Sequence, residues 1–293
     1  MNHTGRNNVL KISKIVMISR LLTEHTGVEV TGVDLTTPMH DEMRSELIAA
    51  FHRHLVLVIR DQILDPQQML DAVRLFGEVF TQHNKRFSLT NCPQIHYLSN
   101  EDHYADGNRY IPGAGYHTDH SNAPEPPKAT VLFARSLPET GGDTQFVNMY
   151  SAYADLSDEV KLKIADLRAV HVYQSRHSVR KLMVLTESDN KNVPNSVVHP
   201  LVRTHPETDR KALYINPIRI EAIEGLLEPE ALALLDELLT HATQEKYQYR
   251  HKWRLGDLVM WDNRCLLHKA NDDYDMTQLR YLYRVMLKGD KPI

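Results

Sequence analysis

The order of apolar and polar residues in the first part of the chain predicts two strands and two helices in alternation. Residues 28–35 alternate between apolar and polar side chains, with the period of two that is typical of a strand. Residues 40–54 and 66–76 carry apolar side chains at helical spacing. The sequence thus predicts a strand over 28–35, a helix over 40–54, a buried strand over 55–59, and a helix over 66–76 that begins at Pro66 and has Gly77 as its C-terminal cap.

From about residue 93 the pattern changes to short runs with β character. Turn residues separate most of these runs, which favours a sandwich or closed barrel over a doubly wound parallel sheet. Helical patches over 150–166 and 228–243 interrupt them. We therefore predict a mainly β jelly roll with flanking α-helices, as a single domain over 1–293. The β runs cover 94–99, 129–137, 143–148, 169–174, 199–205, 211–216, 248–253, 257–262 and 280–287.

Composition and charge exclude several classes of protein. Of the 293 residues, 42% are hydrophobic and 25% are charged, which is typical of a globular chain and not of a disordered or coiled-coil one. The net charge of −4 argues against a nucleic-acid partner, and no apolar run reaches the roughly 18 residues of a membrane span. Two cysteines, Cys92 and Cys265, cannot form a disulfide framework and favour a cytoplasmic location. We interpret residues 1–20 as a flexible N-terminal tail.

The first candidate for chemistry is the segment 115–119, Gly-Tyr-His-Thr-Asp. On a strand, the side chains of His117 and Asp119 would share one face and supply two corners of a metal site. The same geometry would turn His120 away from that site. An H-x-D pair also occurs by chance, so a hydrogen-bonded surface pair is the alternative.

A third donor follows later in the chain. The apolar run 256–261 leads into an Asp-Asn turn, and His268 lies on the next run. Together, His117, Asp119 and His268 form the two-histidine, one-carboxylate set that binds non-haem iron and leaves coordination positions open. We interpret Asp262 and Arg264 as structural groups that hold the turn before His268.

Three further residues suit an anionic ligand. Arg280 and Arg284 would share one face of a strand, and two inward arginines are costly unless each meets an anion. Thr144 offers a hydroxyl directly after the turn formed by Gly141 and Gly142. Arg280 and Thr144 would suit the far carboxylate of a five-carbon 2-oxo acid, because a guanidinium binds a carboxylate through two hydrogen bonds.

In this order, the segments resemble those of the TauD/TfdA family of Fe(II)- and 2-oxoglutarate-dependent dioxygenases. The resemblance implies a double-stranded β-helix, a cupin-like jelly roll, with the metal at one mouth of the barrel. It implies that His117, Asp119 and His268 bind Fe(II), and that Thr144 and Arg280 bind 2-oxoglutarate. Dioxygen and 2-oxoglutarate would be consumed, succinate and CO₂ would form, and a substrate C–H bond would be hydroxylated. The matching segments are 116–122, 138–146, 199–216, 256–270 and 272–292.

The resemblance implies less about the substrate. Arg284 matches a family arginine near the anionic head group, and His83, Tyr116 and Arg219 are further candidates for substrate binding. The aromatic residues within about 80–112 predict a lid over the site. A small anion would bind: a sulfonate such as taurine, an aryloxyalkanoate or other carboxylate, or a sulfate ester. The family also implies a homo-oligomer, a dimer or a tetramer.

Two other functions are consistent with parts of this pattern. A zinc-dependent hydrolase would also use two histidines and a carboxylate, with a zinc-bound water as nucleophile. Such an enzyme has no need for Arg280 and Thr144. A non-catalytic β-barrel binding protein would tolerate loss of the three metal donors, which this sequence retains.

Overall fold

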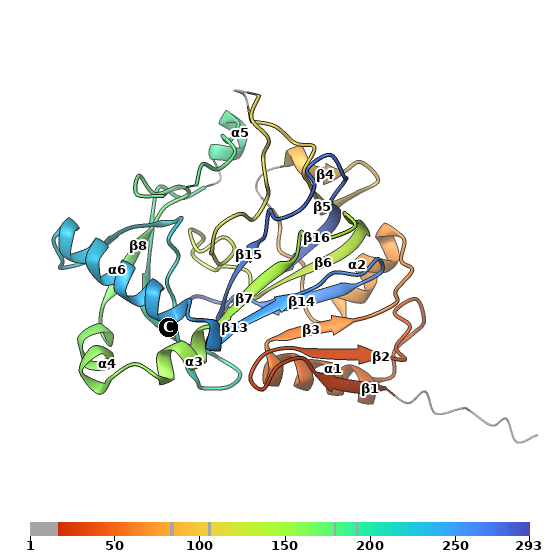
Figure 1. Cartoon of the computed structure of the whole chain (residues 1–293), viewed down its shortest axis with the longest axis horizontal. Helices are drawn as coiled ribbons and strands as arrows, with labels where there is room; N and C mark the ends of the chain where they lie inside the picture. The colour runs from red at the N-terminus through yellow and green to blue at the C-terminus, as the bar shows by residue number, and fades with distance from the viewer. Residues whose placement is uncertain (1–16, 83–84, 105–106, 179, 192) are drawn as a thin grey trace, which may run out of the picture.

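A computed structural model describes residues 17–82, 85–104, 107–178, 180–191 and 193–293 (Figure 1). Its centre is an eight-stranded sheet in the order β1-β2-β3-β14-β6-β16-β5-β4. Neighbouring strands are antiparallel, except that β2 and β3 are parallel. The strands of this sheet are β1 (Ile18–Leu21), β2 (Val28–Thr31), β3 (Val56–Ile59), β4 (Ser88–Leu89), β5 (Cys92–Ser99), β6 (Ala129–Ser136), β14 (Leu258–Asp262) and β16 (Tyr281–Leu287).

Three smaller sheets complete the β structure. They have the orders β13-β7-β15, β12-β8-β9 and β10-β11. Their strands are β7 (Thr144–Asn148), β8 (Arg168–His171), β9 (Val197–Pro200), β10 (Val202–Thr204), β11 (Lys211–Leu213), β12 (Ile220–Ile223), β13 (Gln248–His251) and β15 (Leu266–Ala270). The α-helices are α1 (Asp41–His54), α2 (Pro66–Arg74), α3 (Met149–Ala154), α4 (Asp158–Ile164), α5 (Glu187–Asn190) and α6 (Glu228–Ala242), and η1 (Lys85–Phe87) and η2 (Glu245–Tyr247) are 3₁₀ helices. The predicted mainly β class is confirmed.

The central strands of the large sheet, β3, β14 and β6, are buried on both faces. Along β3, Val56 and Val58 join one core, which includes β7, β15 and α6, whereas Leu57 and Ile59 join another with α1 and α2. The strand is therefore apolar at every position, because side chains on both faces need apolar neighbours. Figure 1 shows α3, α4 and α6 on one side of the molecule and α1 and α2 on the other.

Three of the four predicted helices agree with the structure apart from their ends. The Asp65 side chain accepts a hydrogen bond from the backbone N–H of Gln68. The Gln68 side chain in turn accepts one from the backbone N–H of Asp65, so a capping box begins α2. Leu75 and not Gly77 is the C-cap of this helix. The single helix predicted over 150–166 is two helices, because the Ser157 side chain accepts the N–H of Val160 and begins α4 anew.

Two predicted segments have a different structure. The strand predicted over 28–35 ends at Thr31, where Gly32 takes a positive φ of 78°. The predicted lid over 80–112 is not one loop, because β5 within it pairs with β16 in the large sheet. No helix in the described part of the chain is long and apolar enough to cross a membrane.

Candidate metal centre and adjoining pocket

His117 and His268 are brought together by a single pair of backbone hydrogen bonds. His117 N–H donates to the His268 carbonyl at 3.0 Å, and His268 N–H donates back at 2.8 Å. The strand predicted around His117 is therefore an isolated bridge to β15. Asp119 follows in a turn, and His120 has a φ of 45°. This turn brings His120 to the pocket wall, so the prediction that it faces away was wrong.

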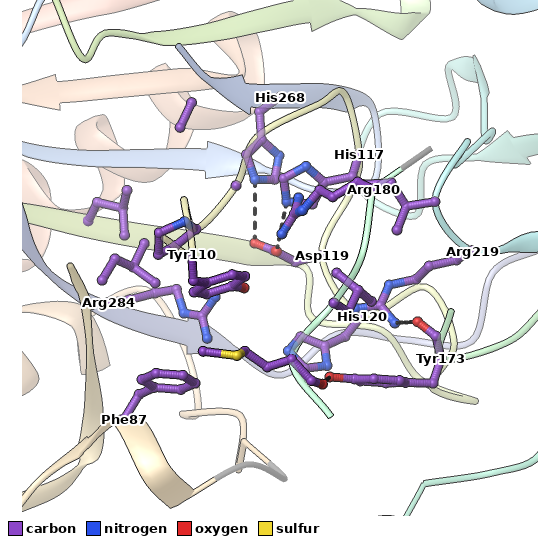
Figure 2. Close-up of a pocket in the computed structure, with 18 of the residues that line it drawn as sticks. Phe87, Tyr110, His117, Asp119, His120, Tyr173, Arg180, Arg219, His268 and Arg284 are labelled. Atoms are coloured by element: carbon purple, nitrogen blue, oxygen red, sulfur yellow. Dashed lines mark hydrogen bonds and ion pairs between the residues drawn. The ribbon is translucent and has the colours of Figure 1, made fainter. Parts of the chain in front are cut away.

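The three predicted metal donors converge on one point, as Figure 2 shows. The Nε2 atoms of His117 and His268 each lie 3.7 Å from an oxygen of Asp119. All three donor atoms lie within 4.8 Å of one another. These N–O separations are too long for hydrogen bonds, but an ion about 2.1 Å from each donor would span them. The geometry therefore fits a divalent metal ion held by these three side chains.

Hydrogen bonds from neighbouring residues orient two of the donors. The Nδ1 atom of His117 lies 2.9 Å from the Gly115 carbonyl, which leaves Nε2 as the atom with a free electron pair. Thr130 on β6 donates its hydroxyl to Asp119 at 2.6 Å. Asn263 in turn donates to the Thr130 hydroxyl at 2.9 Å. Thr130 was not among the residues predicted from the sequence, although it is the single polar residue near the start of an otherwise apolar run.

The protonation states of the donors also suit a metal. Burial lowers the pKa of His117 well below its usual value and lowers the pKa of His268 to about 4, so both imidazoles are neutral at pH 7. Burial alone would raise the pKa of Asp119, but the nearby His268 and His117 outweigh it and lower this pKa. The site therefore offers two neutral nitrogens and one ionised carboxylate.

A second cluster of three donors does not suit a metal. His205, Asp262 and Cys265 also lie within 4.8 Å of one another. However, Arg264 already donates to both carboxylate oxygens of Asp262, at 2.8 and 2.7 Å. Burial raises the pKa of the Cys265 thiol well above its usual value, so the thiol remains protonated. Asp262 and Arg264 thus stabilise the turn before His268, as the sequence predicts.

The metal donors open into a pocket that also holds the two predicted co-substrate residues, Thr144 and Arg280. Arg280 is 5% exposed, and its Nε donates to the Gly142 carbonyl at 2.8 Å. Its Nη2 atom is buried and has no hydrogen-bond partner among the described residues. Trp253 donates to the Thr144 hydroxyl at 3.0 Å. A pocket that offers a buried guanidinium with a free N–H and also a hydroxyl is a suitable site for a carboxylate.

A glycine makes room for this arginine. Gly142 has a φ of 67°, and a Cβ atom there would lie 3.1 Å from the Arg280 Cδ and 3.2 Å from its Nε. A larger residue would therefore be strained in its backbone and crowded against the guanidinium stem. Gly142, the second of the two glycines predicted as a tight turn, thus also makes room for Arg280.

The structure brings two of the four predicted substrate residues into the pocket. Arg284 and Arg219 line its wall. Tyr116 does not, because its hydroxyl donates to Gln248 at 3.0 Å and its ring packs against the core. His83 lies outside the described residues. Arg180, which the sequence analysis did not single out, also lines the pocket.

The fold and the site together define a class of protein. A mainly β architecture carries a buried group of two histidines and one carboxylate, of the kind that binds non-haem iron, and a buried arginine lines the same pocket. The chain belongs to the TauD/TfdA family of dioxygenases. It matches the family described as Taurine catabolism dioxygenase TauD, TfdA family over residues 19–286. The resemblance and the enzyme class predicted from the sequence are confirmed.

Individual relatives cover most of the chain. An alpha-ketoglutarate-dependent 2,4-dichlorophenoxyacetate dioxygenase from Burkholderia sp. (strain RASC) is 37% identical over 245 residues, 80% of this chain and 82% of the relative. An (S)-phenoxypropionate/alpha-ketoglutarate-dioxygenase from Sphingobium herbicidovorans is 34% identical over 90% of this chain and 92% of its own. The crystal structure of AAD-2 in complex with Mn(II) and N-oxalylglycine superposes with a TM-score of 0.80 at 32% identity, over 94% of this chain and 99% of that one.

Proposed function

We propose that this protein is an Fe(II)- and 2-oxoglutarate-dependent dioxygenase that hydroxylates a C–H bond of a small organic anion. Succinate and CO₂ are the co-products. The observation that carries the proposal is that His117, Asp119 and His268 share one pocket with Arg280. A zinc hydrolase would use the three donors, but it has no need for a buried guanidinium with an unpartnered N–H.

Each of these residues has a defined task. His117, Asp119 and His268 hold the metal on one side and leave the pocket side open. Arg280 and Thr144 bind the far carboxylate of 2-oxoglutarate and so fix its orientation. Bound Fe(II) supplies the site at which 2-oxoglutarate and dioxygen react. The protein contributes ligation, orientation and exclusion of water.

The relatives support 2-oxoglutarate as the proposed co-substrate and a small organic anion as the proposed substrate. Two of them are named as alpha-ketoglutarate-dependent enzymes that act on aryloxyalkanoates. AAD-2 was crystallised with N-oxalylglycine, which differs from 2-oxoglutarate by an NH group in place of one CH₂ group. A sulfate ester dioxygenase from Pseudomonas putida is 30% identical over 91% of this chain. We infer that the substrate is a sulfonate, an aryloxyalkanoate, another carboxylate or a sulfate ester, with Arg284 and Arg219 near its anionic group.

The proposal extends to the type of fold, the domain organisation, the cellular location and the oligomeric state. We propose that the sheets form the double-stranded β-helix of a jelly roll, in a single domain that works in the cytoplasm as a homo-oligomer. Both cysteines, Cys92 and Cys265, are free and buried, in agreement with a reducing compartment.

Succinate formation tests the proposed function. Purified protein would receive Fe(II), 2-oxoglutarate and air, with a panel of taurine, longer alkanesulfonates, alkyl sulfates, aryloxyacetates and aryloxypropionates. We expect Fe(II)-dependent succinate that at least one panel member stimulates, and none from His117→Ala or His268→Ala. Metal-dependent hydrolysis with zinc and no succinate under any condition would contradict the proposal.

A further inference from the structure

The pocket holds an unusual excess of positive charge. Four arginines line it, namely Arg180, Arg219, Arg280 and Arg284, and Asp119 is the single acidic residue among the described residues of the lining. Burial lowers the pKa of Arg219 and of Arg280 to about 10, so both remain protonated at pH 7. His117 and His268 are neutral and add nothing to this positive charge, and no acidic residue of the described lining other than Asp119 offsets it.

None of the four arginines forms a close ion pair with a carboxylate among the residues that the structure describes. Asp143 acts on Arg280, and Asp119 on Arg219 and Arg284, only at longer range. The contacts recorded for them are to neutral oxygens: Arg180 donates to the Ala114 carbonyl at 2.7 Å and Arg219 to the Tyr173 carbonyl at 2.6 Å. Arg284 donates to the Gln82 side chain at 2.5 Å. The Nε atoms of Arg180 and Arg284 are buried without a partner in the described chain.

The metal ion and the 2-oxoglutarate of the proposed function do not neutralise this excess of positive charge. A divalent metal, Asp119 and doubly charged 2-oxoglutarate together amount to one negative charge. That charge balances one of the four guanidiniums, and Arg280 is the one in position to take it. Three arginines then face the remaining space, and a substrate with a single negative charge would leave two of them uncompensated. Arg219 is buried, and Arg180 and Arg284 are half-buried with Nε atoms that have no partner among the described residues. Charges of one sign in such positions are costly without counter-ions.

The three remaining arginines fall into two groups. Arg284 lies on β16, whereas Arg219 directly precedes β12 and Arg180 lies in the segment before α5. In Figure 2, Arg284 and Arg219 lie on opposite sides of Asp119, and Arg180 lies beside His117. The pocket lining also includes apolar residues, among them Met183 and Ile218. Two cationic groups in a pocket with apolar lining match a molecule with two acidic ends and an apolar middle.

We propose that the prime substrate carries two separate acidic groups joined by an apolar linker. Arg284 binds one acidic group, and Arg180 and Arg219 bind the other. This inference rests on the proposed function, because the charge balance includes the metal and 2-oxoglutarate. Among the substrate classes named above, it selects diacids, such as a carboxylated aryloxyacetate or a long alkanedioate, over simple monoacids.

Binding of matched pairs of probes tests the inference. The protein would be loaded with Mn(II) and N-oxalylglycine, and affinities measured by calorimetry. One pair is 4-carboxyphenoxyacetate and 4-carbamoylphenoxyacetate, and the other is suberate and its monoamide. Each pair differs by one negative charge at nearly constant shape. We expect the diacid to bind at least about tenfold tighter in one or both pairs, since hydrogen bonds to a charged group are worth roughly 1.5–3 kcal/mol.

Substitution of Arg180 and Arg219 tests whether these two arginines bind the second acidic group of the substrate. Arg180→Gln and Arg219→Gln should weaken diacid binding by about tenfold or more and change monoamide binding little. Lys181→Gln is the matched control, because Lys181 is exposed, lies next to Arg180 and does not line the pocket. If the buried Arg219 variant fails to fold, Arg180→Gln carries the test alone.

Two outcomes would overturn the inference. One is equal affinity for diacid and monoamide in both pairs, and the other is a diacid preference that survives in every folded variant. Failure of the proposed function would look different. It would appear as absent binding of Mn(II) and N-oxalylglycine, or as absent succinate, before any of these probes is added.

Discussion

At the scale of single residues, two of the three proposed metal donors are oriented by residues that supply no donor atom themselves. Asp119 would rotate in its turn if Thr130 and Asn263 did not form a chain of hydrogen bonds to it. His117 is held in the same way by the Gly115 carbonyl. Such partners orient ligands before the ion arrives, so they affect affinity although they contribute no donor atom.

Thr130→Val tests this orienting role. Valine keeps the shape of threonine and removes the hydroxyl that donates to Asp119, so the carboxylate loses one partner. We expect metal affinity to fall by about 10–100-fold. The measurement is a competitive titration of the metal-free protein with Co(II). Thr277→Val, at an exposed hydroxyl far along the sequence, is the control. Equal Co(II) affinity in the Thr130 variant and the wild type would show that Asp119 needs no such support.

At the scale of elements, periodicity predicts local structure but not the contacts that build the site. Helix α1 and strand β3 follow from the spacing of apolar residues alone. The segment around His117 was expected to be a strand because it places two donors at i and i+2. It is instead a turn whose geometry depends on one bridge to β15, more than a hundred residues later. Strand β15 itself was not predicted, since its five residues show no clear alternation.

The roles of pocket residues were predictable to differing degrees. His117, Asp119, His268, Thr144 and Arg280 could be proposed because their order along the chain resembles a known family. Arg180 has no such pattern around it, and its position depends on a loop that packs against Ala114. The resemblance also predicted Tyr116 as a residue that binds substrate. Its hydroxyl instead donates to Gln248, a contact that the local sequence does not reveal. Side-chain direction in loops is set by distant neighbours and not by sequence spacing.

Gly142→Ala tests the turn before β7 as a positioning element. The added Cβ would crowd the Arg280 side chain at 3.1 Å, and alanine disfavours a φ of 67°. We expect weaker binding of 2-oxoglutarate, by about tenfold, at nearly unchanged metal affinity. Anaerobic titration with 2-oxoglutarate gives the first affinity, and titration of the metal-free protein with Fe(II) gives the second. Gly107→Ala is the control, because a Cβ at Gly107 has no neighbour within 4 Å although its φ is also positive. Equal losses in the two variants would point to backbone strain and not to Arg280.

At the scale of the whole molecule, the fold buries many histidines as neutral side chains. His96 on β5 is 2% exposed, and burial lowers its pKa from 6.5 to about 3. His199 is also buried, and its pKa falls to about 4 for the same reason. Below pH 6.5 these groups take up protons in the unfolded chain but not in the folded one. The folded state must therefore lose stability as the pH falls.

The pH dependence of unfolding tests this conclusion. Each buried histidine should reduce the free energy of unfolding by up to about 1.4 kcal/mol per pH unit below its unfolded pKa. His96→Gln keeps a polar group near the Ser88 hydroxyl, which lies 3.0 Å from the His96 Nε2, but cannot be protonated. We expect a shallower loss of stability between about pH 6.5 and 5 in this variant than in the wild type, by urea denaturation. Parallel curves for the two proteins would contradict the assignment of a neutral, buried His96.

The central claim is that one pocket binds both Fe(II) and 2-oxoglutarate, and anaerobic absorption spectroscopy tests it most directly. Chelation of Fe(II) by the 2-oxo acid produces a charge-transfer band that neither ligand gives alone. We predict this band in the wild type, its absence in His268→Ala, and its recovery in Arg280→Gln only at a 2-oxoglutarate concentration higher by about 30-fold or more. A wild-type protein that binds Fe(II) but gives no band at saturating 2-oxoglutarate would contradict the account.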